Sequence, residues 1–210
     1  MKRGKFIVFE GLDGSGKTTQ LKALHSYLTK EKQMKCKTDF EPSDNLLGAL
    51  ARAAIKKRVS FESQTMALLF AADRYEHVTS DIIPHLDSGI HVLCDRYVLS
   101  NLAYQGLSLS FDDIFEYNKA AVSLLFPDLT IFIDTDPQET AERIDKSRIS
   151  GELFDEHGIA VRQSFHKAIE KLTEKGIFTK SNLLIIKGNQ SEEAITREII
   201  TSVLQHMVVC

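Results

Sequence analysis

Residues 5–19, KFIVFEGLDGSGKTT, decide how this chain of 210 residues begins to fold. Residues 5–10 are β-branched or aromatic between two charged ends, which is typical of a strand buried on both faces. Glycines follow at once, and in residues 17–30 Leu21, Leu24 and Leu28 recur at helical spacing. The stretch therefore predicts a buried strand, a glycine-rich loop and a helix, in that order.

The loop between that strand and helix satisfies the pattern G-x-x-x-x-G-K-[ST], through Gly11, Leu12, Asp13, Gly14, Ser15, Gly16, Lys17 and Thr18, with Thr19 next. Glycines let the backbone turn its amide N–H groups toward phosphate oxygens, and the first helical turn adds partial positive charge. Lys17 has the reach to contact the β- and γ-phosphates, and the Thr18 hydroxyl is a ligand for Mg²⁺. A plain glycine-rich turn is the alternative. The strand and helix on either side favour a loop that binds a nucleoside triphosphate.

Short apolar runs alternate with longer segments of helical period along the rest of the chain. Further strands are predicted at residues 35–40, 90–94, 129–134 and 183–187, and helices at 45–58, 61–86, 99–104, 112–125, 159–174 and 191–207. Ser60 is the expected N-cap of the longest helix, Asp136 and Pro137 begin another helix, and the polar residues 148–158 have the composition of a loop. Strands that are apolar on both faces and separated by helices indicate a parallel sheet covered on two sides. We therefore expect one α/β domain over residues 1–210.

The composition narrows the class of protein. Lysine and arginine number 26 and aspartate and glutamate 29, a formal net charge of −3 that argues against a general nucleic-acid binder. Three cysteines without CxxC spacing favour reduced thiols and a cytoplasmic setting. The first apolar run stops at Glu10, and no stretch approaches the roughly 18 apolar residues of a membrane span. We expect neither a nucleic-acid nor a membrane partner.

Two other classes of phosphate-loop protein fit this chain poorly. A GTP-dependent switch needs a guanine-reading N-K-x-D element after a late strand, and the corresponding residues 187–191, KGNQS, lack it. A motor or transport ATPase normally has a longer chain and further domains. A short chain with a partly basic, helical segment late in the sequence is typical of a kinase for a small molecule.

Three segments together resemble the thymidylate kinase family: residues 9–19 (FEGLDGSGKTT), 68–76 (LLFAADRYE) and 95–106 (DRYVLSNLAYQG). The likeness runs from about Lys5 to the final helix, with the motifs in the family's order. It implies a three-layer P-loop kinase fold with a five-stranded parallel sheet. It also implies transfer of the ATP γ-phosphoryl group to dTMP to give dTDP, with Mg²⁺ as cofactor, by a homodimer.

Phe70 and Arg74 are four residues apart on a predicted helix and so share one of its faces. An aromatic ring beside a guanidinium suits a nucleobase, which stacks on the ring and accepts a hydrogen bond at its edge. The resemblance implies that Phe70 stacks on thymine and that Arg74 donates to its O4. The alternative is a core phenylalanine and a surface arginine paired with Asp73 or Glu76.

Asp95 and Arg96 directly follow a predicted strand, at the sheet edge where ligands bind in such folds. An aspartate there can hold Mg²⁺, through water, and the arginine can clamp a phosphate. The family has these residues at the metal and the monophosphate, and a plain ion pair between them is the alternative. In the family the next helix contacts the thymine edge and the sugar, and its tyrosine crowds a ribose 2′-hydroxyl. The matching residues are Ser100, Asn101, Tyr104 and Gln105. For the serine and the glutamine, simple solvation on the helix surface is the alternative.

Asp13 is a carboxylate inside a phosphate-binding loop, and the resemblance explains why. It implies that Asp13 faces the acceptor nucleotide, near the deoxyribose 3′-hydroxyl and the transferring phosphoryl group. Glu10 either supports the site or simply ends a strand. The acceptor is already a phosphate anion, so catalysis needs positioning and charge neutralisation more than a strong base. We therefore assign catalysis to Lys17, Asp13 and Arg96, together with arginines of a lid.

That lid is expected at about residues 143–158, where cations can close over ATP and exclude water. The family carries an extra arginine either in the phosphate loop or in the lid, and Gly14 at the first of these places implies the lid style. Arg148 is the first candidate and Arg143 the second, while Lys146 fits a solvated helix end equally well.

The chain departs from the family's pattern at three places. Phe40 precedes Glu41-Pro42 where many relatives have arginine, residues 152–156 (ELFDE) lack a lid arginine, and Phe165 stands where many relatives have tyrosine. One acceptor-side contact and one lid cation are therefore open. Two other functions stay open as well: a kinase for another monophosphate or a deoxynucleoside, and a nucleotide-binding regulator without activity.

Overall fold

The sheet is the frame on which everything else is placed. The computed structural model describes residues 2–145 and 155–208. Five strands, paired in parallel throughout, lie in the order β2-β3-β1-β4-β5. Their bounds are Phe6–Gly11 (β1), Cys36–Phe40 (β2), His91–Asp95 (β3), Leu129–Asp134 (β4) and Leu183–Lys187 (β5). The predicted five-stranded parallel sheet is confirmed.

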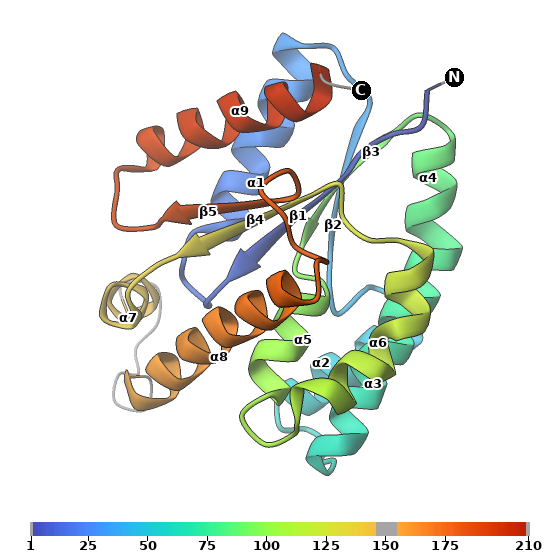
Figure 1. Ribbon diagram of the computed structural model, residues 1–210, viewed down its shortest axis with the longest axis vertical. Helices are drawn as coiled ribbons and strands as arrows, with labels where there is room; N and C mark the ends of the chain where they lie inside the picture. Colours follow the sequence, from blue (N-terminus) through green and yellow to red (C-terminus); the bar gives the residue numbers. More distant parts are fainter. Residues whose placement is uncertain (1, 146–154, 209–210) are drawn as a thin grey trace.

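Alternate side chains of the inner strands enter two separate cores. Ile7 and Phe9 of β1 pack in one, with α1 (Lys17–Ser26) and α9 (Glu192–Val208) as its cover. Phe6 and Val8 pack in the other, against helices that include α5 (Val98–Gln105), α6 (Phe111–Leu124) and α8 (Asp155–Glu174). Figure 1 shows α1 and α9 on one side of the sheet and these helices on the other. The predicted three-layer fold is therefore confirmed.

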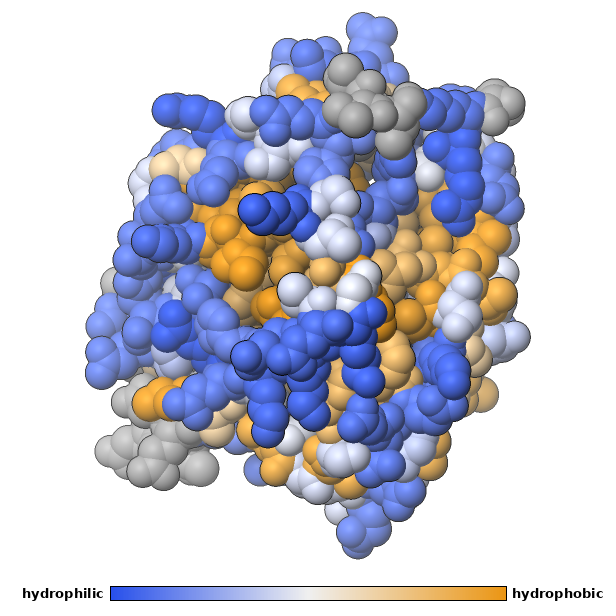
Figure 2. Space-filling view, in the orientation of Figure 1, coloured by the Kyte–Doolittle hydropathy of each residue, from blue (hydrophilic) through white to orange (hydrophobic). Residues whose placement is uncertain are grey.

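The side chains of the central strand are more buried than those of the two edge strands. All six residues of central β1 are buried, whereas the side chains of the edge strands β2 and β5 are half-buried or exposed, except for the buried Ile186. Ile185 of β5 is 47% exposed. Figure 2 shows apolar atoms reaching the surface between α8 and α9, where β5 lies.

The longest predicted helix, residues 61–86, is divided into three pieces. Helix α3 spans Ser63–His77, a π-helical turn η2 spans Val78–Ile82, and α4 spans Ile83–Asp87. Ser60 is not the N-cap, because the helix begins after Glu62. Pro84 lies in the first turn of α4, where a missing N–H costs little, so the chain stays helical up to Asp87.

Helix α2 is shorter than predicted, and helix α7 begins where it was predicted to begin. Helix α2 spans Leu46–Ile55, and Asn45 caps it by accepting from Gly48 N at 2.9 Å. Helix α7 spans Pro137–Asp145, and Asp136 accepts from Gln138 N at 2.9 Å, as its predicted N-cap role requires.

The predicted loop at residues 148–158 is wrong at its end, since α8 already begins at Asp155. Gly158, one of the glycines that suggested a loop, instead lies against α7. A Cβ at this position would lie 3.2 Å from Pro137 Cβ, so a glycine allows the two helices to pack closely. Among the residues that the structure describes, none of the helices is both long and apolar enough to cross a membrane.

Candidate active site

The loop after β1 has a backbone that only glycine adopts readily. Gly11 and Gly16 have φ of 143° and 95°. A Cβ at Gly11 would lie 2.6 Å from the carbonyl oxygen of Ile133 on β4, so the loop passes close to the neighbouring strand. The loop then enters α1 directly, and its amides lie at the positive end of that helix. The backbone therefore forms a cradle suited to anions.

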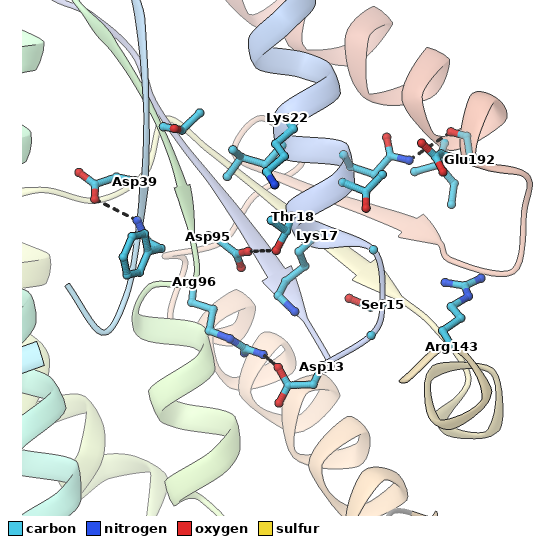
Figure 3. A pocket seen from close by; sticks show the side chains of 18 of the residues that line it. Asp13, Ser15, Lys17, Thr18, Lys22, Asp39, Asp95, Arg96, Arg143 and Glu192 are labelled. Atoms are coloured by element: carbon cyan, nitrogen blue, oxygen red, sulfur yellow. Dashed lines mark hydrogen bonds and ion pairs between the residues drawn. The ribbon is translucent and has the colours of Figure 1, made fainter. Parts of the chain in front are cut away.

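Lys17 lies inside this cradle with only 5% of its surface exposed. Its Nζ donates to the Leu12 carbonyl oxygen at 2.6 Å. Burial and the nearby Arg96 lower the pKa of Lys17 to about 8, which leaves it protonated at neutral pH. Figure 3 shows its side chain pointing into the cavity between Asp13 and Thr18.

Thr18 and Asp95 meet across the same cavity from α1 and the end of β3. The Thr18 hydroxyl donates to Asp95 Oδ2 at 2.6 Å, as Figure 3 shows. The other carboxylate oxygen, Asp95 Oδ1, is buried without a hydrogen-bond partner. A hydroxyl and a carboxylate with a free oxygen are the oxygen donors that Mg²⁺ prefers, so these two residues fit the metal predicted for them.

These residues line a cavity of about 860 Å³, which we call the donor cavity. Its wall contains the predicted ATP residues from Asp13 to Thr19, and Arg143 lies at its α7 side. Arg143 donates to the Gly188 carbonyl oxygen at 3.0 Å and pairs with Glu139 at 3.3 Å. Arg148 and Lys146 lie outside the described residues, as does most of the predicted lid at about 143–158.

Arg96 has a positive φ of 77°, which is rare for a residue with a side chain. Its guanidinium donates to Asp13 Oδ1 at 2.7 Å and to Ser100 Oγ at 2.7 Å, and lies 5.1 Å from the Tyr104 ring centre. The predicted alternative of a plain Asp95–Arg96 pair is therefore wrong, because Arg96 pairs with Asp13 and Asp95 with Thr18. Burial opposes ionisation of Asp13, but Arg96 and Lys17 outweigh it and lower its pKa.

Glu10 lies beneath this arginine, fully buried. It accepts from the backbone N–H groups of Tyr97 and Ser100 at 2.8 and 3.1 Å, and from the Ser100 hydroxyl. Burial raises its pKa to about 7. The sequence left its role open, and the structure shows that it holds the start of α5 below Arg96.

A second, smaller cavity of about 270 Å³ adjoins the first, and we call it the acceptor cavity. Every residue predicted to contact dTMP lines it: Phe70, Arg74, Arg96, Ser100, Asn101, Tyr104 and Gln105. Its other lining residues include Ile55 and Met66. Asp13, Glu41 and Arg96 line both cavities, so the two open toward each other.

Arg74 is 2% exposed, and its partners differ from the alternative considered for it. Its Nη2 pairs with Glu41 Oε2 at 2.7 Å and donates to the Tyr97 carbonyl oxygen at 3.1 Å, while Nη1 donates to Asn118 Oδ1. Asp73 instead accepts from Ser43 N at 2.8 Å. Arg74 is thus fixed in the cavity wall, with only Nε lacking a hydrogen-bond partner.

The sequence missed two residues that hold this wall, Glu41 and the fully buried Asn118. Glu41 directly follows β2, and this position was the one signal in the sequence that placed it at the same sheet edge. No local pattern marks Asn118.

Phe40 is 40% exposed beside the donor cavity, with the Arg52 guanidinium 5.9 Å from its ring centre. Phe165 is buried behind Tyr104, edge to face at 5.9 Å, and does not line the acceptor cavity.

Comparison with known proteins gives one consistent result. A family model described as "Thymidylate kinase" matches residues 9–199. A thymidylate kinase of Geobacillus sp. (strain WCH70) is 38% identical over 183 residues, which cover 82% of this chain and 86% of that protein. One of Acholeplasma laidlawii is 37% identical over 207 residues, covering 96% of this chain and 100% of the relative. One of Staphylococcus epidermidis is 33% identical over 205 residues, covering 96% and 98%.

Proposed function

The chain belongs to the thymidylate kinase family and phosphorylates dTMP to dTDP with ATP as donor, and we propose that its two joined cavities bind the two nucleotides. The observation that carries this proposal is the shared wall formed by Asp13, Glu41 and Arg96. A phosphoryl group bound in one cavity can then meet an acceptor bound in the other, and positioning supplies most of the catalysis.

In the donor cavity, we assign phosphate binding to the backbone N–H groups of residues 11–19. Lys17 neutralises charge on the transferring phosphoryl group, supported by its buried, protonated ammonium. Arg143 and Arg148 of the lid add positive charge over the triphosphate, with Arg143 supported by its place beside the cavity.

In the acceptor cavity, Phe70 stacks on the thymine, and Arg74, Asn101 and Gln105 face the edge of the base. The unpartnered Nε of Arg74 supports its role as a donor. Arg96 binds the phosphate of dTMP, and Asp13 lies near the 3′-hydroxyl of its sugar. Ser100 and Tyr104, which both accept from Arg96, lie beside the sugar and the phosphate.

We assign Mg²⁺ to Thr18 and Asp95, the latter through water, because their oxygen atoms fit it. When bound, the ion neutralises charge on the ATP phosphates. Thr18 and Asp95 orient it, and the Thr18 hydroxyl already lies against Asp95.

Further parts of the proposal concern the whole chain. Residues 1–210 act as one domain in the cytoplasm, where ATP is supplied and free thiols such as Cys94 persist.

A homodimer is supported by exposed apolar side chains on α2 and α3, namely Leu46, Leu50, Leu68 and Tyr75. Sedimentation at several protein concentrations tests the dimer.

The function itself is tested by a panel of acceptors with ATP and Mg²⁺. We expect fast product formation with dTMP, and slow or no reaction with dCMP, dGMP and thymidine. Equal rates on dCMP or on thymidine would contradict the assignment of dTMP. Tight ATP binding without any product would instead indicate a regulator.

A further inference from the structure

A cluster of charged side chains lies where β2 ends against α3, and none of the roles above uses its centre. His77, the last residue of α3, is 4% exposed. Its Nε2 lies 3.1 Å from Asp39 Oδ2 and its Nδ1 lies 3.4 Å from Glu41 Oε1. Asp81 Oδ2 lies 3.7 Å from Nε2. The imidazole therefore joins two residues at the exit of β2 to the helix beside them.

Asp39, His77 and Asp81 are close enough together to suggest a metal site, but two observations argue against one. The Lys37 ammonium lies 3.0 Å from Asp39 Oδ2 and also pairs with Asp81, so a cation is already present where the carboxylates converge. Both ring nitrogens of His77 face carboxylates, which suits a protonated ring that donates twice, whereas a metal ligand must be neutral. Burial opposes that charge, but Asp39 and Glu41 outweigh it and raise the pKa of His77 to about 10.

Glu41 connects this cluster to the acceptor cavity. One of its oxygens faces His77, and the other lies 2.7 Å from Arg74 Nη2. The carboxylates Asp39, Glu41 and Asp81 are balanced by the cations Lys37, His77 and Arg74. Loss of the imidazolium leaves Asp39 and Glu41 to repel each other. Both line the donor cavity, but of the two only Glu41 also lines the acceptor cavity, where it pairs with Arg74, so a shift of Glu41 is transmitted to the acceptor side.

We propose that His77 is a positioning residue for the acceptor: by holding Asp39 and Glu41 together at the end of β2, it fixes Glu41 and, through it, the base-facing Arg74. The inference rests on the proposed function of the acceptor cavity. It assigns the effect of His77 to the binding of the nucleoside monophosphate and not to the binding of ATP or to the chemical step.

The chain offers a matched control in His85, which lies two turns further along the same helical run. His85 Nδ1 also lies 3.2 Å from Asp81, at Oδ1, but its side chain is 35% exposed and none of its recorded contacts is to Asp39 or Glu41. His77→Gln and His85→Gln therefore remove the same chemical group from one helix, with and without the connection to Glu41.

The experiment measures KM for dTMP, KM for ATP and kcat for the wild type and both variants of the full chain. We expect His77→Gln to raise KM for dTMP by about tenfold, with KM for ATP and kcat within about twofold of the wild type. His85→Gln should match the wild type in all three. A role in general stability alone would instead raise both KM values or neither.

A double-mutant cycle with Glu41→Gln tests the route. If His77 acts through Glu41, KM for dTMP in the double variant should equal that of Glu41→Gln alone. Multiplicative effects, or a His77→Gln variant that matches His85→Gln, would overturn the inference. Should His77→Gln fail to fold, His77→Lys keeps a charge but cannot bridge both carboxylates, and the same rise in KM for dTMP is expected. A wild type that does not phosphorylate dTMP would overturn the proposed function instead.

Discussion

The donor and acceptor cavities are built in opposite ways. The donor cavity takes its central part from one continuous stretch, residues 13–22, and backbone amides and a buried ammonium form its floor. The acceptor cavity is less than a third of that volume and takes side chains from the end of β2, from α2, α3 and α5, and from Asp13. The centre of the first is thus a property of local sequence, whereas the second exists only when distant segments have packed.

The difference teaches where specificity and chemistry reside. A backbone cradle accepts any triphosphate, because it contacts groups that all such nucleotides share. The acceptor cavity presents a ring, amides and a fixed guanidinium, the kinds of group that can distinguish one base from another. Asp13, Glu41 and Arg96 belong to both cavities. Asp13 and Arg96 pair with each other between the two and should affect both substrates, whereas Glu41 is tied to Arg74 of the acceptor cavity and should affect mainly the acceptor.

The largest effect on activity is expected from Lys17, which lines the donor cavity and not the acceptor cavity. Lys17→Ala should lower kcat by about 10³-fold, because it removes positive charge from the migrating phosphoryl group in a buried site. KM for dTMP should change little. Steady-state kinetics check this, with the exposed Lys30→Ala as control, and a variant that retains a tenth of the activity would contradict the role.

Arg96 should affect both cavities at once. Arg96→Lys keeps the charge but loses the simultaneous contacts to Asp13 and Ser100, so kcat/KM for dTMP should fall by about 10²-fold, with kcat also reduced. A change confined to KM for dTMP would place Arg96 in the acceptor cavity alone. Initial rates over a grid of both substrates separate these outcomes.

Phe70 should affect the acceptor cavity only. Phe70→Ala should weaken dTMP binding by roughly 1–3 kcal/mol, the range for loss of a stacked base, with KM for ATP unchanged. Phe61→Ala is the control, since it removes an exposed aromatic ring that lies just before the same helix and outside the cavity. Equal KM values for dTMP in Phe70→Ala and the wild type would remove Phe70 from the site.

The smallest effect concerns stability against pH. The folded pKa of His77, about 10, lies above its ordinary value of 6.5, so its stabilisation is complete below pH 6.5 and is lost as pH rises through 10. Asp39, Glu41 and Asp81 are the charged groups that face it, and Lys37, Arg74 and His85 pair with those carboxylates.

His77→Gln should therefore lower the free energy of unfolding by about 1–2 kcal/mol at pH 6, and by less at pH 9.5. Urea denaturation at both values measures the difference. A gap between wild type and variant that widens with pH would contradict the assigned charge.

The sequence predicted the phosphate-loop part of the donor cavity, residues 13–19, because its motif is continuous and its chemistry is that of the backbone. It did not predict the parts of the wall that residues 38–41 and 190–195 contribute. The resemblance to the family also implied which acceptor residues share a cavity, and helical spacing by itself predicted only that Phe70 and Arg74 lie on one face. Their roles toward dTMP stay predictions.

The rest depended on packing between segments far apart in sequence. No local pattern reveals that Asn118 of α6 accepts from Arg74, or that burial makes Glu10 the support of α5. The end of the predicted loop at 148–158 was wrong for a related reason: its polar composition indicated a loop, whereas the place of Gly158 is set by contact with α7.

At Arg96 the left-handed backbone costs stability, while the side chain that it positions serves the site. A glycine there would relax the main chain, which favours glycine by about 1 kcal/mol at such torsions, but it would remove the guanidinium between Asp13 and Ser100. The strained backbone is therefore kept for the contacts of the guanidinium, and an engineer who relaxes it with glycine would remove a residue that joins the two cavities.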